Sequence, residues 1–440
     1  MRIAIFTDVF LEVPGGIPSS IKAQKKALES RGDEVVVFCP GYSQPENISN
    51  VVIVPTHRML HFGGAPLSKR PGKVEKWIEK NYPGFDFDLV HVHYEASCSI
   101  AGMLIARKYK LPLIQTMHGR EDMAIGVNVP HPLKTLVGTG LNFLHGRYIR
   151  HTIKIKRDKD LAPTIARSKM WEVMVNHANF ADRVITPSEH FKKKLQHYGV
   201  KTPIFPVSNG VSDEMVRELD QKVEKENRNL VRVKKKDEPL KLFWNSRLSK
   251  EKRIMPFLKS LRMMQEPYEF TACGNGNQLA KAKRYVKRHH LNAKILGQVP
   301  HEDMLNYMLD QHLSVTVSDG FDTQGLTLLE AEATGMPVFF CDPDMKESVP
   351  SGGYIMSKTA SVEDMAKALD NAAQNVEEIS KMSRVMIAHR KEILQSAQIP
   401  KLYKVYEIEK TVASKGWPLE KRLLAAIFDA SSPFQMDIGE

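Results

Sequence analysis

Cysteine is scarce in this sequence, and the spacing of the few that occur argues against two kinds of site. Four cysteines stand among 440 residues, and no two of them form a Cys-x-x-Cys pair. This distribution argues against a disulfide framework and against a zinc site, and it suits a reducing cytoplasm. We therefore expect a cytoplasmic protein with no metal centre.

Long apolar runs are also missing. The sequence has no stretch of about 18 consecutive apolar residues, so no segment is expected to span a membrane. The first residues, MRIAIF, form an apolar run that is too short for a signal peptide and lacks a cleavage site, so we interpret them as a strand. The sequence predicts a protein that is soluble or lies on a membrane surface.

Acidic residues are outnumbered by basic ones. The chain has 63 Lys and Arg against 51 Asp and Glu, which gives a formal net charge of +12. This excess favours a polyanionic neighbour, which can be nucleic acid, anionic lipid or a phosphorylated substrate, although solubility alone also explains it. No nucleic-acid-binding motif accompanies the charge, so we expect no nucleic-acid partner.

What the sequence does contain is a repeated alternation of short apolar runs with helix-like stretches. Apolar, β-branched runs such as 2–6, 34–38 and 89–93 alternate with candidate helices, and the pattern starts again at 240–246. Strands that are apolar on both faces are typical of a parallel sheet covered by helices. The sequence therefore predicts an α/β protein built from two doubly wound, Rossmann-like domains.

A turn signal at Asn209-Gly210 marks the expected boundary between the two domains. We place the N-terminal domain at 1–208 and the C-terminal domain at 209–415. The last stretch, 416–440, begins with an amphipathic run after a Gly-Trp-Pro turn. We expect it to form a helix that packs back on the first domain, and a frayed tail is the alternative.

Glycines and cations stand where loops follow the expected strands. Arg247 and Lys252 follow the first strand of the second domain, at the sheet edge where ligands bind in this architecture. Two cations there can clamp a diphosphate, and glycines before a helix let backbone amides approach a phosphate. Each feature taken alone also fits a solvated turn. The glycines concerned are Gly16, Gly274, Gly276 and Gly297.

Two acidic residues bracket the start of a helix in the second domain. Asp322 lies just before this helix, and Glu330 lies two turns into it. The Glu330 carboxylate can accept hydrogen bonds from both hydroxyls of a ribose, and Asp322 can bind a sugar hydroxyl. In the first domain, His118 follows an apolar strand and can also bind a sugar hydroxyl. An equal alternative is a structural role, in which its hydrogen bonds are made within its own loop.

Taken in order, these motifs resemble glycosyltransferase family 4, whose members are retaining enzymes of the GT-B fold, with two Rossmann-like domains facing a cleft. The resemblance implies a nucleotide-sugar donor and requires neither cofactor nor metal. It covers nearly the whole chain and rests on Gly16, His118, SNGV (208–211), Arg247 with Lys252, GNG (274–276) and DTQGLTLLEAEATGMPV (322–338).

The resemblance also implies the roles of individual residues. Arg247 and Lys252 would bind the diphosphate, Glu330 the ribose, and Asp322 would lie near the donor sugar, with His118 completing the catalytic set. Asp322 stands where the family usually has Glu, so its carboxylate reaches one methylene less far. The donor-binding residues implied are Gly16, Asn209, Gly274, Gly276, Gly297, Thr323, Gln324, Gly325 and Leu326.

A basic amphipathic segment at 132–160 suggests the acceptor. Val137, Leu141, Leu144 and Tyr148 fall on one helical face, and cations gather in the second half. This pattern predicts a helix lying on an anionic membrane surface, with an ordinary core helix as the alternative. In this segment the chain is similar to bacterial diacylglycerol glucosyltransferases. The expected membrane-binding residues are Arg147, Arg150, Lys154, Lys156 and Arg157.

We therefore expect a retaining hexosyltransferase that moves glucose from UDP-glucose to a lipid such as diacylglycerol. It would bind peripherally at the cytoplasmic face of the cell membrane. Two alternatives stay open. A polysaccharide or small-molecule glycosyltransferase would share every donor motif, and a catalytically silent GT-B subunit would support a partner enzyme.

Overall fold

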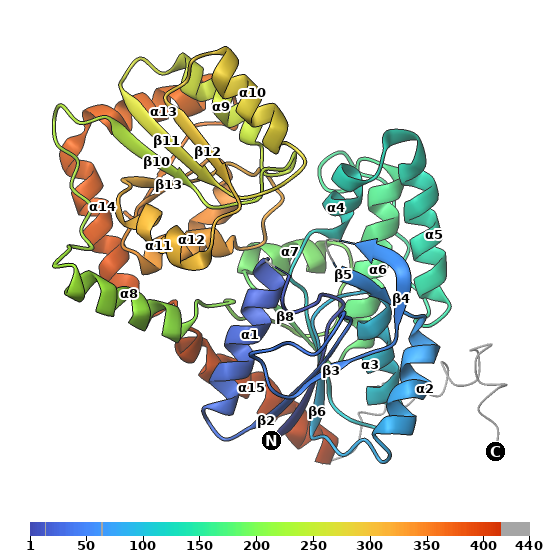
Figure 1. The fold of residues 1–440 in the computed structure, drawn as a ribbon. Helices are drawn as coiled ribbons and strands as arrows, with labels where there is room; N and C mark the ends of the chain where they lie inside the picture. Colours follow the sequence, from blue (N-terminus) through green and yellow to red (C-terminus); the bar gives the residue numbers. More distant parts are fainter. Residues whose placement is uncertain (14, 63–64, 415–440) are drawn as a thin grey trace. The chain divides into compact units, whose positions relative to one another are not determined.

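The computed structural model describes residues 1–13, 15–62 and 65–414 and divides the chain into two compact units (Figure 1). Among the described residues, the N-terminal unit comprises Met1–Val207 and residues 399–414, and the C-terminal unit is Ser208–Gln398. Residues 399–414, which the sequence places in the second domain, therefore belong to the N-terminal unit. The expected terminal helix at 416–440 lies outside the described residues.

The N-terminal unit is built on a seven-stranded parallel sheet with the strand order β3-β2-β1-β6-β7-β8-β9. A separate antiparallel pair, β4 and β5, follows β3 along the chain. The strands are β1 (Arg2–Phe6), β2 (Glu34–Cys39), β3 (Val51–Ile53), β4 (Thr56–Phe62), β5 (Ala65–Ser68), β6 (Leu89–Val92), β7 (Leu113–Thr116), β8 (Arg183–Thr186) and β9 (Ile204–Pro206).

Helices cover both faces of this sheet because alternate side chains of its strands point to opposite faces. Ala4 and Phe6 of β1 pack into a core that is shared with α2, α3 and α6, whereas Ile3 and Ile5 pack against α1 and α15. Figure 1 shows α1 and α15 on the same side of the sheet. The helices are α1 (Gly16–Glu29), α2 (Pro71–Asn81), α3 (Ser97–Lys108), α4 (Glu121–Asn128), the 3-10 turn η1 (His131–Leu133), α5 (Lys134–Gly146), α6 (Ile165–Phe180), α7 (Glu189–His197) and α15 (Gln395–Ser414).

The C-terminal unit repeats the architecture with six parallel strands in the order β12-β11-β10-β13-β14-β15. Its strands are β10 (Leu240–Trp244), β11 (Tyr268–Cys273), β12 (Ala293–Gly297), β13 (Leu313–Thr316), β14 (Val338–Phe340) and β15 (Tyr354–Met356). Its helices are α8 (Asp213–Lys225), α9 (Ile254–Met263), α10 (Leu279–Arg288), α11 (His301–Leu309), α12 (Leu326–Ala333), η2 (Pro343–Ser348), α13 (Val362–Gln374) and α14 (Val376–His389). The prediction of two Rossmann-like α/β units is confirmed.

None of the helices in the described ranges is both long enough and apolar enough to cross a bilayer.

Candidate active site

Three loops at the carboxyl edge of the second sheet are hydrogen-bonded to one another. The Leu248 amide, in the loop after β10, donates to the carbonyl of Asn275 at 2.9 Å, and the Gln278 amide donates to the carbonyl of Leu248 at 2.8 Å. The amide of Gly274, after β11, donates to the carbonyl of Gly297, at the end of β12, at 2.6 Å. The structure therefore brings the expected glycine turns together with the loop that carries Arg247 and Lys252.

Gly274 and Gly276 are glycines because their neighbours leave no room for a side chain. Their φ angles are 147° and 155°, in a region that side chains disfavour. A Cβ at Gly274 would lie 2.2 Å from the carbonyl oxygen of Ser246, and one at Gly276 would lie 2.4 Å from that of Leu248. These two glycines let the loops after β10 and β11 pack backbone against backbone.

Lys252 and Asp322 form an ion pair that joins the loop after β10 to the segment before α12. The Lys252 Nζ lies 2.5 Å from Asp322 Oδ1, and both side chains are largely buried. The same ammonium lies 5.3 Å from the ring centre of Phe321, within cation–π distance. Arg247 is different, because its side chain is 61% exposed and pairs with Glu251 at 3.2 Å. Arg247 can therefore reach a ligand at this edge.

The charge state of Asp322 follows from these neighbours. Burial by itself would raise the pKa of Asp322, but the ammonium of Lys252, the hydroxyl of Ser318 and the charge of Arg247 outweigh it and hold the pKa below its ordinary value. The Ser318 hydroxyl donates to the other carboxylate oxygen, Oδ2. Asp322 is consequently ionised at neutral pH, as a partner of the site's cations.

Glu330 lies in α12 and is bound to the first residue after β10. Asn245 Nδ2 donates to Glu330 Oε2 at 2.7 Å, whereas Asn245 Oδ1 is buried with no hydrogen-bond partner. Burial raises the pKa of Glu330 to about 7, and the Asn245 bond opposes that rise. Sequence reasoning missed Asn245, although its place directly after a strand of the parallel sheet is the same signal that singled out Arg247.

The side chain of Gln324 argues against a direct role in ligand binding, because its amide oxygen and its amide nitrogen are both hydrogen-bonded within the protein. Its Oε1 accepts hydrogen bonds from the backbone and side-chain amides of Asn209, each at 2.9 Å. Its Nε2 donates to Ser208 Oγ at 2.7 Å. The side chains of the expected donor-binding residues Asn209 and Gln324 thus fix the first residues of the unit to the segment before α12.

The start of α12 is shaped for backbone contacts. Gly325 precedes the helix in the left-handed conformation, with φ of 77°, and no side chain caps the helix there. Thr323 is buried next to it, and Leu326 packs its side chain against Val211 and Leu329. The remaining contribution of Gly325 and Leu326 to a ligand is therefore through their backbone amides.

The expected residues of the N-terminal unit also lie at sheet or helix ends. His118 follows β7, and its Nε2 lies 2.9 Å from Nδ1 of His93, which follows β6. Gly16 begins α1, and no side chain caps the start of this helix, because the residue before it is Gly15. Both are placed where a ligand could meet polar groups at the carboxyl edge of the first sheet.

Buried carboxyl groups, which sequence reasoning missed, accompany His118 at this edge. Asp8, just after β1, accepts hydrogen bonds from the backbone amides of Ala96, Cys98 and Ser99 at 3.1, 2.6 and 3.2 Å, and so caps the start of α3. Burial and, to a smaller extent, Glu121 and Asp8 raise the pKa of Glu95 well above its ordinary value. The signal was available, because both acids lie within three residues of the end of a strand of the parallel sheet.

The expectation of a single amphipathic helix over 132–160 is wrong in two respects. The helix α5 ends at Gly146, and residues 147–160 form no further helix. Val137 and Leu141, expected on the exposed apolar face, pack instead against α4 and α6, and Tyr148 packs against the main core. This face of α5 points inward because α5 packs closely against α6. A Cβ at Gly138 would lie only 3.0 Å from Ala166 Cα.

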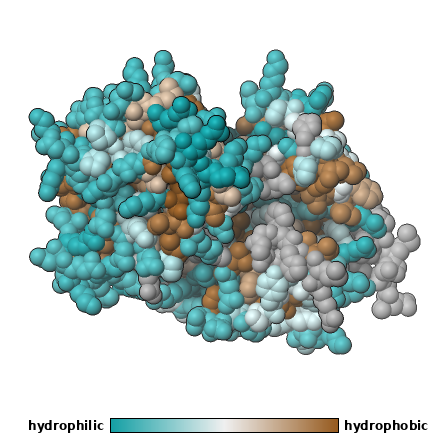
Figure 2. Space-filling view, turned by 45° about the horizontal axis from the view of Figure 1, so that its top comes forward, coloured by the Kyte–Doolittle hydropathy of each residue, from teal (hydrophilic) through white to brown (hydrophobic). Residues whose placement is uncertain are grey.

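A different stripe of α5 is exposed. Leu136 is 69% exposed, Phe143 66% and Leu144 52%, so that Leu144 is the one member of the expected face that lies outward. Leu133, the last residue of η1, is three residues before Leu136. Figure 2 shows apolar surface at several places among the hydrophilic side chains, and in the N-terminal unit these α5 residues are among the most exposed large apolar side chains. We call Leu133, Leu136, Phe143 and Leu144 the α5 stripe.

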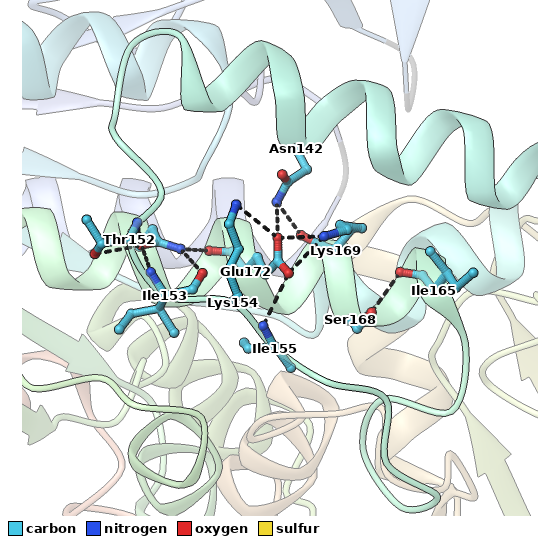
Figure 3. A network of polar contacts seen from close by, with 10 residues as sticks. Asn142, Thr152, Ile153, Lys154, Ile155, Ile165, Ser168, Lys169 and Glu172 are labelled. Atoms are coloured by element: carbon cyan, nitrogen blue, oxygen red, sulfur yellow. Dashed lines mark hydrogen bonds and ion pairs between the residues drawn. The ribbon is translucent and has the colours of Figure 1, made fainter. Parts of the chain in front are cut away.

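The chain beyond α5 lies extended along α6 (Figure 3). Asn176 Oδ1 accepts the amides of Thr152 and Ile153 at 2.8 and 2.9 Å, and Glu172 accepts the amide of Ile155 at 3.2 Å. Ile153 and Ile155 pack inward on the core, so the alternate residues face solvent. Five of the exposed cations here, Arg147, Arg150, Lys154, Lys156 and Arg157, are those expected at the membrane, and we call them the basic segment.

Metal ligands are not assembled in the described ranges: no group of three or more His, Cys, Asp or Glu side chains there is arranged to hold an ion.

Two family models match successive parts of the chain. The model described as Glycosyltransferase Family 4 matches residues 14–215, and the model described as Glycosyl transferases group 1 matches residues 225–388. The two matches lie on the N-terminal and C-terminal units and together account for most of the chain.

Individual proteins agree with this assignment. The chain is 25% identical over 349 residues to the alpha-monoglucosyldiacylglycerol synthase of Streptococcus pneumoniae, covering 77% of this chain and 70% of that protein. It is 25% identical over 414 residues to the synthase of the same name from Acholeplasma laidlawii, covering 87% and 91%. A solved structure of Anabaena Alr3699/HepE in complex with UDP-glucose superposes with a TM-score of 0.61 and 16% identity, covering 92% of this chain and all of that one. The chain is therefore a glycosyltransferase of the GT-B fold that belongs to glycosyltransferase family 4.

Proposed function

We propose that this enzyme transfers glucose from UDP-glucose to a diacylglycerol-type lipid at an anionic membrane surface, with retention of configuration. The observation that carries the proposal is the similarity, over most of the chain, to two proteins that are named as alpha-monoglucosyldiacylglycerol synthases. Their product carries an α linkage, and UDP-glucose is itself an α-glycoside. An α product made from an α donor means that configuration is retained.

The cations at the second sheet edge supply the chemistry that the leaving group needs. As the bond between glucose and phosphate loosens, negative charge grows on the departing diphosphate. Arg247 is exposed and Lys252 stands at the same loop, so both can bind that charge as it develops. A bound diphosphate would share the Lys252 ammonium with Asp322, which keeps the lysine oriented before the donor arrives.

Glu330 and Asn245 fit the ribose. A carboxylate accepts hydrogen bonds only, so Glu330 in its ionised form can take both ribose hydroxyls. Asn245 holds one Glu330 oxygen at 2.7 Å and presents its own unpartnered, buried carbonyl oxygen beside it. An unsatisfied buried oxygen is costly, and a ligand hydroxyl would remove that cost.

The acceptor hydroxyl then attacks from the face that the diphosphate leaves. A phosphate oxygen of the departing group takes the proton from that hydroxyl, so no protein nucleophile takes part. Asp322 would contact a hydroxyl of the transferred sugar, and His118 would contact a sugar hydroxyl from the N-terminal unit. In this scheme the protein contributes positioning and charge stabilisation rather than covalent catalysis.

Two features of the N-terminal unit support a membrane surface as the place of reaction. The α5 stripe offers apolar side chains that can enter the lipid headgroup region, and the basic segment follows it directly in the chain. Each Lys or Arg near an anionic membrane contributes about 1 kcal/mol of attraction. We propose that these two surfaces hold the enzyme peripherally at the cytoplasmic face of the cell membrane.

A screen of donors and acceptors tests the proposed reaction. The purified full-length chain is incubated with UDP-glucose, UDP-galactose or GDP-mannose, and with vesicles that contain diacylglycerol or with soluble glycans. Mass spectrometry of the lipid and water-soluble products identifies what has been glucosylated. We expect a hexose on diacylglycerol from UDP-glucose alone, and nuclear magnetic resonance of that product should show an α linkage.

Other outcomes decide between the alternatives. A sugar transferred only to soluble glycans would reject the lipid acceptor but keep the donor site. Transfer from GDP-mannose in place of UDP-glucose would reject the donor, and a β-linked product would reject retention.

A further inference from the structure

Each of the two cations at the edge of the second sheet is paired with its own buried acid. The Lys252 Nζ lies 2.5 Å from Asp322 Oδ1, and Arg247 Nη2 lies 3.2 Å from Glu251 Oε1. The carboxyl side chains of Asp322 and Glu251 are 10% and 3% exposed. Burial acts to raise the pKa of Asp322, whereas the charges of Lys252 and Arg247 act to lower it. Since Arg247 affects the carboxyl of the other pair, the two pairs lie close together.

The two cations differ in how firmly their surroundings hold them. The Lys252 side chain is 14% exposed, so the neighbouring chain restricts it, whereas the Arg247 side chain is 61% exposed. An arginine side chain that projects into solvent moves among many rotamers, and each contact that fixes it must overcome that entropy. Among the described residues, Glu251 is the one acid that pairs with Arg247. The orientation of the Arg247 guanidinium therefore depends on this contact.

Glu251 is itself firmly placed. Its Oε1 accepts a hydrogen bond from Ser249 Oγ at 2.6 Å. The residue before Ser249, Leu248, is bound through both its amide and its carbonyl to the glycine turn after β11. The acid that supports Arg247 is thus tied, through the backbone of its own loop, to the neighbouring loop of the sheet edge.

An acid at this place, taken by itself, is unfavourable for both stability and donor binding. Within the described ranges, Glu251 Oε2 is buried with no hydrogen-bond partner, and a buried acceptor without a donor is costly. A negative charge beside the expected diphosphate would also repel it. The compensating effect that the geometry offers is orientation, because the partner of Glu251 that reaches outward is the guanidinium of Arg247.

We propose that Glu251 is a positioning residue, which holds the Arg247 guanidinium at the sheet edge in the orientation that the donor diphosphate needs. This proposal rests on the proposed function, since that function places a diphosphate at this edge. A guanidinium has five N–H donors, so a bond to Glu251 leaves others for phosphate oxygens. Arg247 is then oriented before the reaction, as Lys252 is, and no cation has to be ordered while the glycosyl bond breaks.

The mobility of Arg247 can be measured with no donor present. The full-length chain is labelled with 15N at its arginines, and the Nε signal of Arg247 is identified by its absence from Arg247→Ala. We expect 15N relaxation to show a more mobile Nε–H group in Glu251→Gln than in the wild type, because a neutral amide holds the guanidinium less strongly than a carboxylate does. Equal mobility in the two proteins would overturn the proposal, whether or not the protein transfers sugar.

Kinetics test whether Glu251 acts through Arg247. Glu251→Gln keeps the size of the side chain and an oxygen for Ser249 but removes the charge, so we expect kcat to fall about fivefold, the effect of one ordinary hydrogen bond. The KM for UDP-glucose should change far less, because the lost orientation is offset by the lost repulsion of the diphosphate. In Arg247→Ala the same substitution should change kcat by less than about twofold, since no guanidinium is left to orient. An equal loss in both backgrounds would reject the proposal.

Further comparisons keep the outcomes distinct. Glu332→Gln is the matched control, because Glu332 is another buried acid of the C-terminal unit, bound to His389, and its neutralisation should leave kcat unchanged. If Arg247→Ala keeps near-normal turnover, the diphosphate site and the role of Glu251 fail together. If Arg247→Ala loses activity while Glu251→Gln equals the wild type, the role of Glu251 alone fails. Ser249→Ala, which removes the hydroxyl that fixes Glu251, should resemble Glu251→Gln and replaces it if that variant does not fold.

Discussion

The ammonium of Lys252 lies 2.5 Å from a carboxylate oxygen of Asp322, and this pair connects two segments that are 70 residues apart in the sequence. Lys252 comes from the loop after β10, and Asp322 comes from the segment before α12. The pair therefore holds a cation at the sheet edge in a fixed place before any donor binds. A diphosphate at this edge would meet an oriented ammonium, which is how a preorganised site stabilises developing charge.

Lys252→Ala should lower turnover by about a hundredfold or more, because it removes a donor to the charge that develops on the leaving group. Arg247→Ala should act in the same direction. The measurement is kcat for glucosyl transfer, with thermal unfolding recorded in parallel. Lys250→Ala is the matched control, since Lys250 is an exposed lysine of the same loop. If both Arg247→Ala and Lys252→Ala keep near-normal turnover while folded, the assignment of the diphosphate site is wrong.

Asp322→Glu should retain activity or increase it, because it restores the longer acid that is usual in this family. Asp322→Asn should be less active, since it keeps the size of the side chain but removes the charge that faces Lys252. The comparison is made on kcat and on the KM for UDP-glucose. Complete loss in Asp322→Glu would show that the Ser318–Asp322–Lys252 arrangement accepts only the shorter acid.

Nucleotide affinity should depend on pH through Glu330. Burial raises the pKa of this carboxyl to about 7, and only the ionised form accepts both ribose hydroxyls. The affinity for UDP should therefore be constant above about pH 7 and fall about tenfold for each pH unit below it. Glu330→Gln should bind UDP more weakly at pH 8 and lose this dependence, as titration calorimetry can show. Glu332→Gln, in the same helix but bound to His389, is the control that should keep wild-type affinity.

The same pKa predicts an effect of opposite sign on stability. A carboxyl whose pKa is raised to about 7 in the folded state favours folding while it is protonated. That contribution is present below the pKa of the unfolded chain and is lost as pH rises through about 7. Glu330→Gln resembles the protonated form, so it should unfold at a higher temperature than the wild type near pH 8 and show little difference near pH 4. A lower melting temperature at pH 8 would contradict the burial argument.

The meeting of the loops at the edge of the second sheet could be predicted from sequence, because a parallel sheet brings the ends of its strands to one edge. The loop of Arg247 and Lys252 does contact the glycine turns, whereas the role of these residues in donor binding stays a prediction. The same rule could not show that Asn245 binds Glu330 or that Gln324 binds Asn209, because these contacts join residues 85 and 115 positions apart. Such pairings depend on where side chains meet after folding, which strand periodicity does not record.

The α5 region shows why the sequence analysis assigned the exposed apolar face of 132–160 to the wrong residues. Both stripes of this helix are apolar, so helical periodicity alone could not tell whether Val137 and Leu141 or Leu136 and Phe143 faced outward. The deciding contact is made by Gly138, which brings α5 close to Ala166 of α6. Beyond Gly146, the alternation of Ile153 and Ile155 with charged residues has a period of two, which is typical of an extended segment rather than a helix.

The last prediction separates the electrostatic and the apolar parts of membrane binding. Neutralising four residues of the basic segment should weaken binding to anionic vesicles by up to about 4 kcal/mol, and high salt should have a similar effect on the wild type. Substituting Leu136 and Phe143 by Ser should weaken binding with little dependence on salt, because that contribution comes from apolar burial.

Vesicle flotation measures both effects. Val233→Ser serves as the control, since Val233 is an equally exposed apolar residue of the C-terminal unit and should not alter binding. Hydrolysis of UDP-glucose in solution should survive every one of these changes, because none of them alters a residue expected to bind the donor. A wild-type protein that stays in solution with anionic vesicles at low salt would reject the membrane surface. Basic-segment variants that bind as well as the wild type would leave the net charge of +12 without a role at a membrane, and a soluble acceptor would then be favoured.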